Sequence, residues 1–230
     1  ARMFPRKGTP KQASDYCKKE DPDFFEDGIM SEQGKRSDLD AVHSMIVEGT
    51  SIGKIISQHP TQYIKFYKGI TDVWNRHVKH REEQPEVIVY YGPTGTGKSH
   101  RAHAQAKKWA EELGEDDYYH HGPGKGRWFC GYEANKVAYF EEFRAGKADN
   151  GIHYAFLLEL LDKWRCQVQP KGLTCQKWVA TRIIMTSPVH PKEWYQYQAT
   201  EGTDTESTQL MRRITELYRC ISTTEMIKEK

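Results

Sequence analysis

The chain has 230 residues, 29% of them charged and 37% hydrophobic, a composition typical of soluble proteins with one or two domains and a sizeable core. Its longest apolar runs are far too short to span a bilayer, so we expect no membrane partner. The net charge is only +2, so binding of nucleic acid must depend on local clusters of Lys and Arg.

The five cysteines are an odd number without a C-x-x-C spacing. They predict a reducing compartment, with neither a disulfide framework nor a zinc site. No signal peptide is visible, and the chain opens at Ala1 rather than at a methionine, so we expect upstream residues to be missing.

The first predicted element is a helix that begins at Thr9-Pro10, because proline is favoured at the first helical position. Tyr16 and Lys19 are three residues apart and share one face of this helix. Phe24-Phe25 predict a short strand, and the segment 28–34 predicts a loop.

Residues 36–81 predict a block of three helices, with breaks at Gly49 and before Pro60. The third helix has a wide apolar face, formed by Tyr63, Phe66, Tyr67, Ile70, Trp74 and His77. This face is either an internal core or a surface that packs against another subunit, and the sequence leaves both open. The basic run 76–81 predicts a solvated helix end or linker.

The central motif spans residues 86–99, which read E-V-I-V-Y-Y-G-P-T-G-T-G-K-S. Its apolar half predicts a buried strand, and the alanine-rich segment 100–113 predicts a helix that ends at Gly114. The loop between them fits G-x-x-x-x-G-K-[ST] through Gly92, Pro93, Thr94, Gly95, Thr96, Gly97, Lys98 and Ser99. Such a loop predicts that a nucleotide binds: backbone N–H groups surround the phosphates, Lys98 reaches the β- and γ-phosphates and Ser99 holds Mg²⁺. The alternative, a chance glycine-rich turn, is disfavoured by the flanking strand and helix.

A second buried strand is predicted over 137–140 and ends in Glu141-Glu142. Ligands of open α/β sheets bind at the carboxyl ends of strands, so we assign Glu141 to the Mg²⁺ shell and Glu142 to the attacking water. The alternative is a solvated charge pair. The preceding segment 117–121 predicts a strand, in which His120 and His121 point to opposite faces; this favours solvated or packed histidines over a metal site.

Basic residues gather between 163 and 182, a stretch without acidic residues. An amphipathic helix with Trp164 on its apolar stripe precedes a β-hairpin predicted over 166–179. Its tip carries Lys171 and Gly172 within reach of a nucleic-acid backbone, and Arg165 and Lys177 add positive charge. Trp178 fits base stacking and core packing equally well.

A third buried strand, 182–187, ends in Thr186-Ser187, whose hydroxyls can contact a γ-phosphate and the attacking water. The segment 206–214 predicts a helix carrying Arg212 and Arg213. Either is a candidate for the arginine, often donated by a neighbouring subunit, that stabilises the transition state of phosphoryl transfer. Arginines on an exposed helix commonly only aid solubility. A closing strand is predicted over 217–221.

In this order the motifs resemble those of the superfamily 3 helicases, which are AAA+-like ring motors. They resemble more closely the replication-associated (Rep) proteins of circoviruses and related viruses with single-stranded circular DNA. The corresponding segments are 16–19 (the Y-x-x-K motif that closes an HUH endonuclease domain), 34–39 (the joint after it), 92–99 (Walker A), 137–142 (Walker B), 169–172 (the DNA-touching hairpin), 185–188 with 193–195 (the sensor motif) and 210–214 (the arginine-finger helix).

Two departures from the family pattern matter. The Walker B pair is Glu-Glu where circovirus proteins commonly have Asp-Asp, which keeps the charge and lengthens the reach. Pro188 stands where many members have the sensor Asn, so we expect Ser187 to take the sensor role, with Thr186 second.

The resemblance implies an α/β fold in three parts: a C-terminal remnant of an HUH endonuclease domain with linker (1–35), a helical oligomerisation domain (36–82) and an AAA+-like P-loop ATPase domain (83–230). It implies a hexameric ring that uses ATP and Mg²⁺ to move 3′ to 5′ on single-stranded DNA during rolling-circle replication in the host nucleus.

For the full-length protein the resemblance also implies nicking and joining at the viral origin with Mn²⁺ or Mg²⁺, with Tyr16 as nucleophile and Lys19 supporting it. From spacing alone, a structural tyrosine beside a solvated lysine is favoured. Two other functions remain open: a P-loop nucleotide kinase, which would phosphorylate a small acceptor without DNA, and a DNA-binding scaffold that uses ATP only to assemble.

Overall fold

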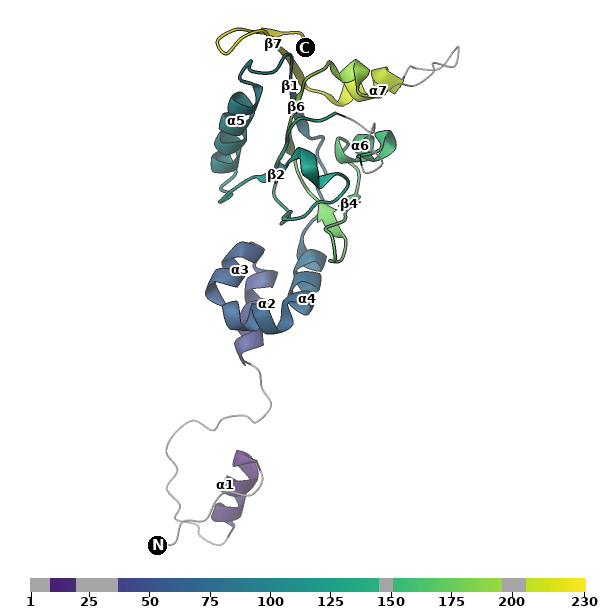
Figure 1. Ribbon diagram of the computed structural model, residues 1–230. Helices are drawn as coiled ribbons and strands as arrows, with labels where there is room; N and C mark the ends of the chain where they lie inside the picture. The colour runs from purple at the N-terminus through teal and green to yellow at the C-terminus, as the bar shows by residue number, and fades with distance from the viewer. Residues whose placement is uncertain (1–8, 20–36, 145–150, 196–205) are drawn as a thin grey trace.

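The computed structural model describes residues 9–19, 37–144, 151–195 and 206–230 (Figure 1). The strand predicted at Phe24-Phe25 and most of the segment 1–35 lie outside these ranges. The first helix, α1 (Pro10–Lys18), begins where the sequence predicts. Thr9 and Gln12 form its capping box, in which each side chain bonds the other's backbone N–H.

Three helices form the next layer, and they are α2 (Ser37–Val47), α3 (Ile52–Gln58) and α4 (Pro60–His77). Their apolar sides meet in a cluster built on Val42, Ile46, Ile52, Ile55, Ile70 and Trp74. Of the aromatic face of α4, Ile70 and Trp74 are buried in this cluster and Tyr63 and Phe66 pack partly buried against it, whereas Tyr67 and His77 are exposed. The helix is bent at Phe66, which has non-helical backbone angles.

The largest sheet of the rest of the described chain has six strands in the order β2-β3-β6-β1-β7-β8. Its strands are β1 (Glu86–Tyr91), β2 (Tyr119–His121), β3 (Val137–Phe140), β6 (Arg182–Ser187), β7 (Glu216–Cys220) and β8 (Met226–Lys228). All pairings are parallel except that of β7 with β8. The three predicted buried strands are confirmed, whereas β8 was not predicted.

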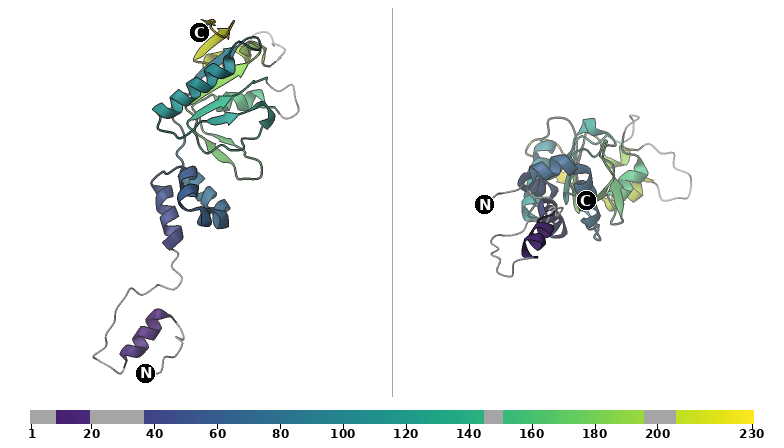
Figure 2. Two further views of the ribbon diagram at one scale, coloured as in Figure 1. Left: turned by 60° about the vertical axis from the view of Figure 1, so that its left-hand side comes forward. Right: turned by 90° about the horizontal axis from the view of Figure 1, so that it is seen from below.

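Helices cover both faces of this sheet (Figures 1 and 2). Helix α5 (Lys98–Glu112) packs on one face, and α6 (Tyr154–Leu160) and α7 (Glu206–Arg213) pack on the other. Successive residues of a strand alternate between the two cores: Val87 and Val89 face α6 and α7, and Ile88 and Tyr90 face α5. This double coverage explains why the central strands read as continuous apolar runs.

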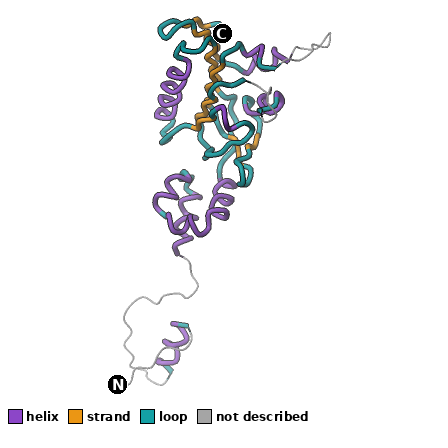
Figure 3. Tube along the Cα trace, in the orientation of Figure 1, coloured by secondary structure: helices purple, strands orange, loops and turns teal. Residues whose placement is uncertain are grey.

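The predicted β-hairpin is present as β4 (Cys166–Val168) and β5 (Gln176–Trp178), and it lies between the sheet and the α2–α4 layer (Figure 3). Trp178 is a core residue: it is fully buried, and its Nε1 donates to the carbonyl oxygen of Leu160 at 2.9 Å. Helix α6 is shorter than predicted. Trp164 lies beyond its end and is 67% exposed, so its place on the apolar stripe was wrong.

The segment between α4 and β1 is not simply a solvated linker. Arg81 is 6% exposed, and its guanidinium donates to the carbonyl oxygens of Ala180 (2.8 Å) and Glu159 (2.9 Å). Asn75 binds the hairpin from the last turns of α4: its Nδ2 donates to the carbonyl oxygen of Cys175 at 2.8 Å, and its Oδ1 accepts from the N–H of Lys177 at 3.0 Å. These contacts join the helical layer to the sheet and to the hairpin.

Two short 3-10 helices, η1 (Pro123–Lys125) and η2 (Pro191–Glu193), complete the fold. Within the described ranges, no helix has the length and apolar character needed to cross a membrane.

Candidate active site

The phosphate loop joins the carboxyl end of β1 to the first turn of α5, as predicted. Gly92 has φ +140°, and a Cβ at this position would lie 2.3 Å from the carbonyl oxygen of Cys220 on β7. Gly97, the N-cap of α5, has φ +77°, in the left-handed region that favours glycine. The first N–H groups of α5 have no intrahelical acceptor and are available to an anion at this end of the helix.

Lys98 lies in the loop, where its Nζ donates to the carbonyl oxygens of Gly92 (2.8 Å) and Pro93 (2.7 Å). Partial burial lowers the pKa of Lys98, and the charge of Glu142 is one of the opposing effects. The charge of Glu142 therefore acts on the pKa of Lys98, and both residues lie at the same edge of the sheet. Arg101 also supports the loop, because its guanidinium donates to the Thr96 carbonyl oxygen at 2.7 Å.

Glu141 and Glu142 follow β3 at the same sheet edge as the loop, because only β6 lies between the parallel strands β3 and β1. Glu142 has φ +48°, an uncommon value for a residue other than glycine. Its N–H donates to Thr186 Oγ1 at 3.0 Å, which supports this conformation, and its carboxylate is 3.4 Å from Arg144. Backbone strain of this kind concentrates at functional sites.

Tyr139 connects the phosphate loop to β6. Its hydroxyl is 3.3 Å from Thr186 Oγ1. Burial raises the pKa of Tyr139, and hydrogen bonds to Thr186 and Ser99 oppose that rise. Ser99, Tyr139, Thr186 and the backbone of Glu142 therefore form a continuous polar line, which the sequence did not indicate.

Ser187 lies off this line. It is fully buried, and its Oγ accepts hydrogen bonds from Trp194 Nε1 (2.8 Å) and from the N–H of Val189 (3.2 Å). The side chains of Thr186 and Ser187 are both fully buried, but the Ser187 hydroxyl bonds Trp194 and Val189, so we favour Thr186 for the sensor role. Thr186, our second choice, is the residue of this pair that lies beside Glu142.

Glu141 contacts a residue that our site assignment missed. His120 on β2 places Nε2 3.0 Å from Glu141 Oε2. His121 points to the opposite face, as predicted, where its Nε2 is 2.9 Å from the carbonyl oxygen of Gly126. Burial lowers the pKa of His121 to about 4. The contact of His120 with Glu141 depends on the parallel pairing of β2 with β3, which sets His120 opposite Tyr139 and which the sequence did not predict.

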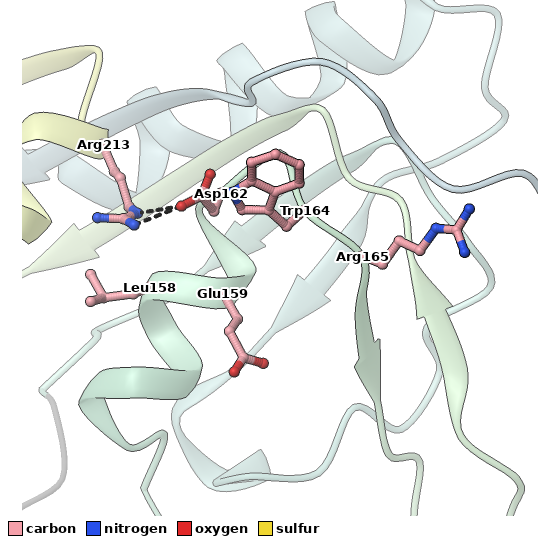
Figure 4. Close-up of a pocket in the computed structure, with 6 residues that line it drawn as sticks. All are labelled: Leu158, Glu159, Asp162, Trp164, Arg165 and Arg213. Carbon is pink, nitrogen blue, oxygen red and sulfur yellow. Dashed lines mark hydrogen bonds and ion pairs between the residues drawn. The ribbon is translucent and has the colours of Figure 1, made fainter.

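Arg212 and Arg213 end α7 but differ in their contacts. Arg213 donates to Asp162 Oδ2 from Nη2 (2.6 Å) and Nε (3.1 Å), a pair that borders the pocket in Figure 4. Burial alone would raise the pKa of Asp162, but the hydrogen bonds and charge of Arg213 contribute to lowering it below its usual value. Arg212 is exposed and has no hydrogen bond or ion pair within the described ranges. Arg213 is thus engaged within the chain, whereas the guanidinium of Arg212 is exposed.

The residues predicted to touch DNA divide in the same way. Lys171 and Gly172 are exposed in the turn between β4 and β5. Lys177 instead turns toward α4, where its Nζ donates to the carbonyl oxygens of Arg76 and Val78, both at 2.8 Å. This ammonium group is engaged within the chain, so we expect Lys177 to contribute less to DNA binding than Lys171.

Arg165 is exposed and follows Trp164 at the start of the hairpin (Figure 4). At the other end of the chain, Tyr16 lies in the last turn of α1 and is 80% exposed. The backbone N–H of Lys19 donates to the carbonyl oxygen of Tyr16 at 3.3 Å and ends the helix.

Comparison with known proteins adds three findings. Residues 88–189 match the family described as RNA helicase. The replication-associated protein of Porcine circovirus 2 is 30% identical over 226 residues, which are 97% of this chain and 66% of that protein. The replication-associated protein of Human associated cyclovirus 1 is 32% identical over 210 residues, covering 90% of this chain and 69% of that protein.

The replication-associated protein of Porcine circovirus 1 is 30% identical and is covered to 62% of its length, so the chain spans about two-thirds of the length of these two porcine circovirus proteins. Among solved structures, the S. cerevisiae Hsp104–ADP complex aligns with a TM-score of 0.36 and 14% identity, covering 83% of this chain and 30% of the other.

Proposed function

The chain belongs to the replication-associated proteins of circoviruses and cycloviruses, viral replication proteins with a helicase-like domain, and from that premise we propose that residues 83–230 hydrolyse ATP to move single-stranded DNA. The observation that carries the proposal is the shared sheet edge. There the phosphate loop, the carboxylates after β3 and the hydroxyl of Thr186 lie at the ends of three adjacent parallel strands.

The residues at this edge fit Mg²⁺ and a nucleotide. The donors are the Ser99 hydroxyl and the Glu141 carboxylate, and Mg²⁺ prefers oxygen ligands. When bound, Mg²⁺ neutralises charge on the phosphates. Lys98 adds a second positive charge within the loop, and Glu142 orients or deprotonates the attacking water. Thr186 holds the Glu142 backbone in position through the hydrogen bond described above.

The DNA is proposed to pass the exposed hairpin turn at Lys171 and Gly172, with Arg165 as a further phosphate contact. Arg212 is proposed as the arginine that one subunit donates to the ATP site of the next, because Arg213 is already paired with Asp162. Both assignments require a closed ring, and the family resemblance favours a hexamer assembled through the segment 36–82.

For the full-length protein we propose nicking and joining of DNA at the viral origin, with the exposed Tyr16 as nucleophile, Lys19 as its cationic neighbour and Mn²⁺ or Mg²⁺ as cofactor. Rolling-circle replication of a single-stranded DNA genome would place the protein in the host nucleus. This part of the proposal rests on the family and on the Y-x-x-K spacing.

The deciding experiment measures ATP hydrolysis with and without single-stranded DNA, across protein concentrations. We expect DNA to stimulate turnover and Lys98→Ala to abolish it, because Lys98 is the cation held in the phosphate loop. Lys107→Ala, an exposed lysine on the same helix, is the matched control and should retain turnover. Phosphorylation of a small acceptor without DNA would indicate a kinase, and ATP binding without hydrolysis would indicate a scaffold; either result contradicts the motor.

A further inference from the structure

Three side chains from three separate elements converge beside the end of β3. His103 comes from α5, His120 from β2, and Glu141 follows β3. Each offers one donor atom, and the three atoms lie within 4.8 Å of one another. It is the one group of this kind within the described ranges.

The two imidazole rings are oriented by their surroundings. The hydroxyl of Tyr118 contacts Nδ1 of His103 at 2.5 Å, which leaves Nε2 of that ring for another partner. The rings of both histidines pack on Tyr139, His103 edge-on at 4.8 Å and His120 stacked at 5.2 Å between centroids. A hydrogen bond to the second ring nitrogen is the usual support of a metal-bound histidine.

Two imidazoles and one carboxylate are a ligand set that binds Zn²⁺ with the fourth position open to water. Bonds of about 2.0–2.1 Å in a tetrahedral site set ligand atoms about 3.4 Å apart. The His120 Nε2 to Glu141 Oε2 distance is 3.0 Å, and the widest separation in the cluster, at most 4.8 Å, needs to close by at most about 1.4 Å. All three side chains are only partly buried, so small rotations suffice.

We propose that His103, His120 and Glu141 bind a divalent cation of the zinc type, and that its binding inhibits ATP hydrolysis. Imidazole ligands favour Zn²⁺ over Mg²⁺, which prefers oxygen. Glu141 is common to both sites, because it is also the residue that we place in the Mg²⁺ shell. A zinc ion held by the two histidines would keep this carboxylate turned toward β2 and away from the nucleotide. The inhibitory half rests on the proposed ATPase, and the binding half does not.

The position of His103 strengthens the coupling. It lies four residues after Ser99 on α5, so the two residues share one face of the helix. The zinc site and the phosphate loop are therefore carried by the same helix and meet at the same carboxylate.

The first test titrates the protein, free of nucleotide, with Co²⁺ as a spectroscopic probe and with Zn²⁺ in a calorimeter. We expect one ion per chain, visible cobalt bands typical of nitrogen and oxygen ligands, and displacement of cobalt by zinc. His103→Ala and His120→Ala should each weaken binding by more than about tenfold, and Tyr118→Phe should weaken it less. His100→Ala, an exposed histidine on the same helix, should bind as wild type.

Wild-type affinity in both His103→Ala and His120→Ala would overturn the site. A near-ultraviolet band of cobalt–thiolate character would do the same, since it would place the ion on a cysteine such as the exposed Cys130. The second test measures zinc inhibition of Mg·ATP hydrolysis, relative to the zinc-free rate of each variant. Inhibition should persist in His100→Ala and disappear in His120→Ala. Zinc bound at the site without inhibition would refute the regulatory half, whereas a wild type that binds zinc but lacks ATPase activity would refute the proposed function instead.

Discussion

At the scale of single residues, Glu142 combines an unusual backbone with an exposed carboxylate. The hydrogen bond from its N–H to Thr186 supports the φ of +48°, so the backbone from which the side chain extends is held in place at the sheet edge. Glu142→Gln keeps the shape and removes the base. We expect this variant to bind Mg·ATP normally and to hydrolyse it about 100-fold or more slowly. The check is ATP binding measured beside single-turnover hydrolysis.

Glu141→Gln is the matched comparison. It should raise the Mg²⁺ concentration needed for half-maximal turnover, because Glu141 is assigned to the metal shell rather than to the water. Identical behaviour of the two variants would contradict the division of roles between the carboxylates.

His121 makes stability depend on pH. Burial lowers its pKa to about 4, against about 6.5 in an unfolded chain, so between these values the unfolded state binds more protons than the folded state. Its contribution is fully present above pH 6.5 and is lost as pH falls toward 4, by an amount on the order of 3 kcal/mol. Urea unfolding between pH 7 and 4 measures this slope. His121→Gln should flatten it, and His59→Gln, a partly exposed control, should not.

At the scale of elements, local patterns were sufficient wherever a motif and its own neighbours decide the structure. The run Val87–Tyr91, the glycines of the loop and the alanines of α5 predicted strand, turn and helix, because propensity and burial agree there. The hairpin was also predicted. The secondary structure of these segments is decided by their own residues, so the local sequence pattern is enough to predict it.

What the sequence did not reveal depends on partners that are distant along the chain. The buried Arg81 donates to the carbonyl oxygens of Glu159 and Ala180. Because every residue has a backbone carbonyl, the sequence does not show which residues accept these bonds. From the sequence, Lys177 is a candidate DNA contact. In the structure the end of α4 lies beside it and binds its ammonium group. In the same way, Ser187 and Thr186 look equivalent until the strand fixes which hydroxyl faces which core.

The hairpin supplies a test that separates these two lysines. Lys171→Ala should weaken single-stranded DNA binding and reduce its log–log salt slope by about 0.7, because one phosphate contact is lost. Lys177→Ala should leave the slope unchanged and lower the melting temperature, since the carbonyl oxygens of Arg76 and Val78 at the end of α4 lose a donor. DNA binding measured at several salt concentrations, with melting curves for each variant, decides the matter. A reduced slope in Lys177→Ala instead would return that residue to the DNA surface.

At the scale of the whole molecule, the two arginines of α7 predict a shared active site. Arg212→Ala should fold normally and lose roughly 1,000-fold in hydrolysis, if it supplies charge to a neighbouring subunit. Arg213→Ala should instead lose stability, by about 1–3 kcal/mol, because Asp162 loses its partner.

Mixing distinguishes donation between subunits from an effect within one. An interface that takes Arg212 from a Glu142→Gln subunit and Glu142 from an Arg212→Ala subunit is complete, so the mixture of these two inactive variants should regain part of the wild-type rate. No recovery, in a mixture shown to form joint assemblies, would place Arg212 outside the active site.

The attachment of β5 to α4 also has a mechanical consequence. The strand is tied to the last turns of α4 through Asn75 and Lys177, and its end is anchored in the core by Trp178. With these contacts at its base, the β4–β5 hairpin cannot move independently of α4 and of the core. If the protein moves DNA as proposed, a force applied to DNA at the turn would be transmitted through these contacts into the α2–α4 layer, and the contacts of that layer with neighbouring subunits would bear part of the load.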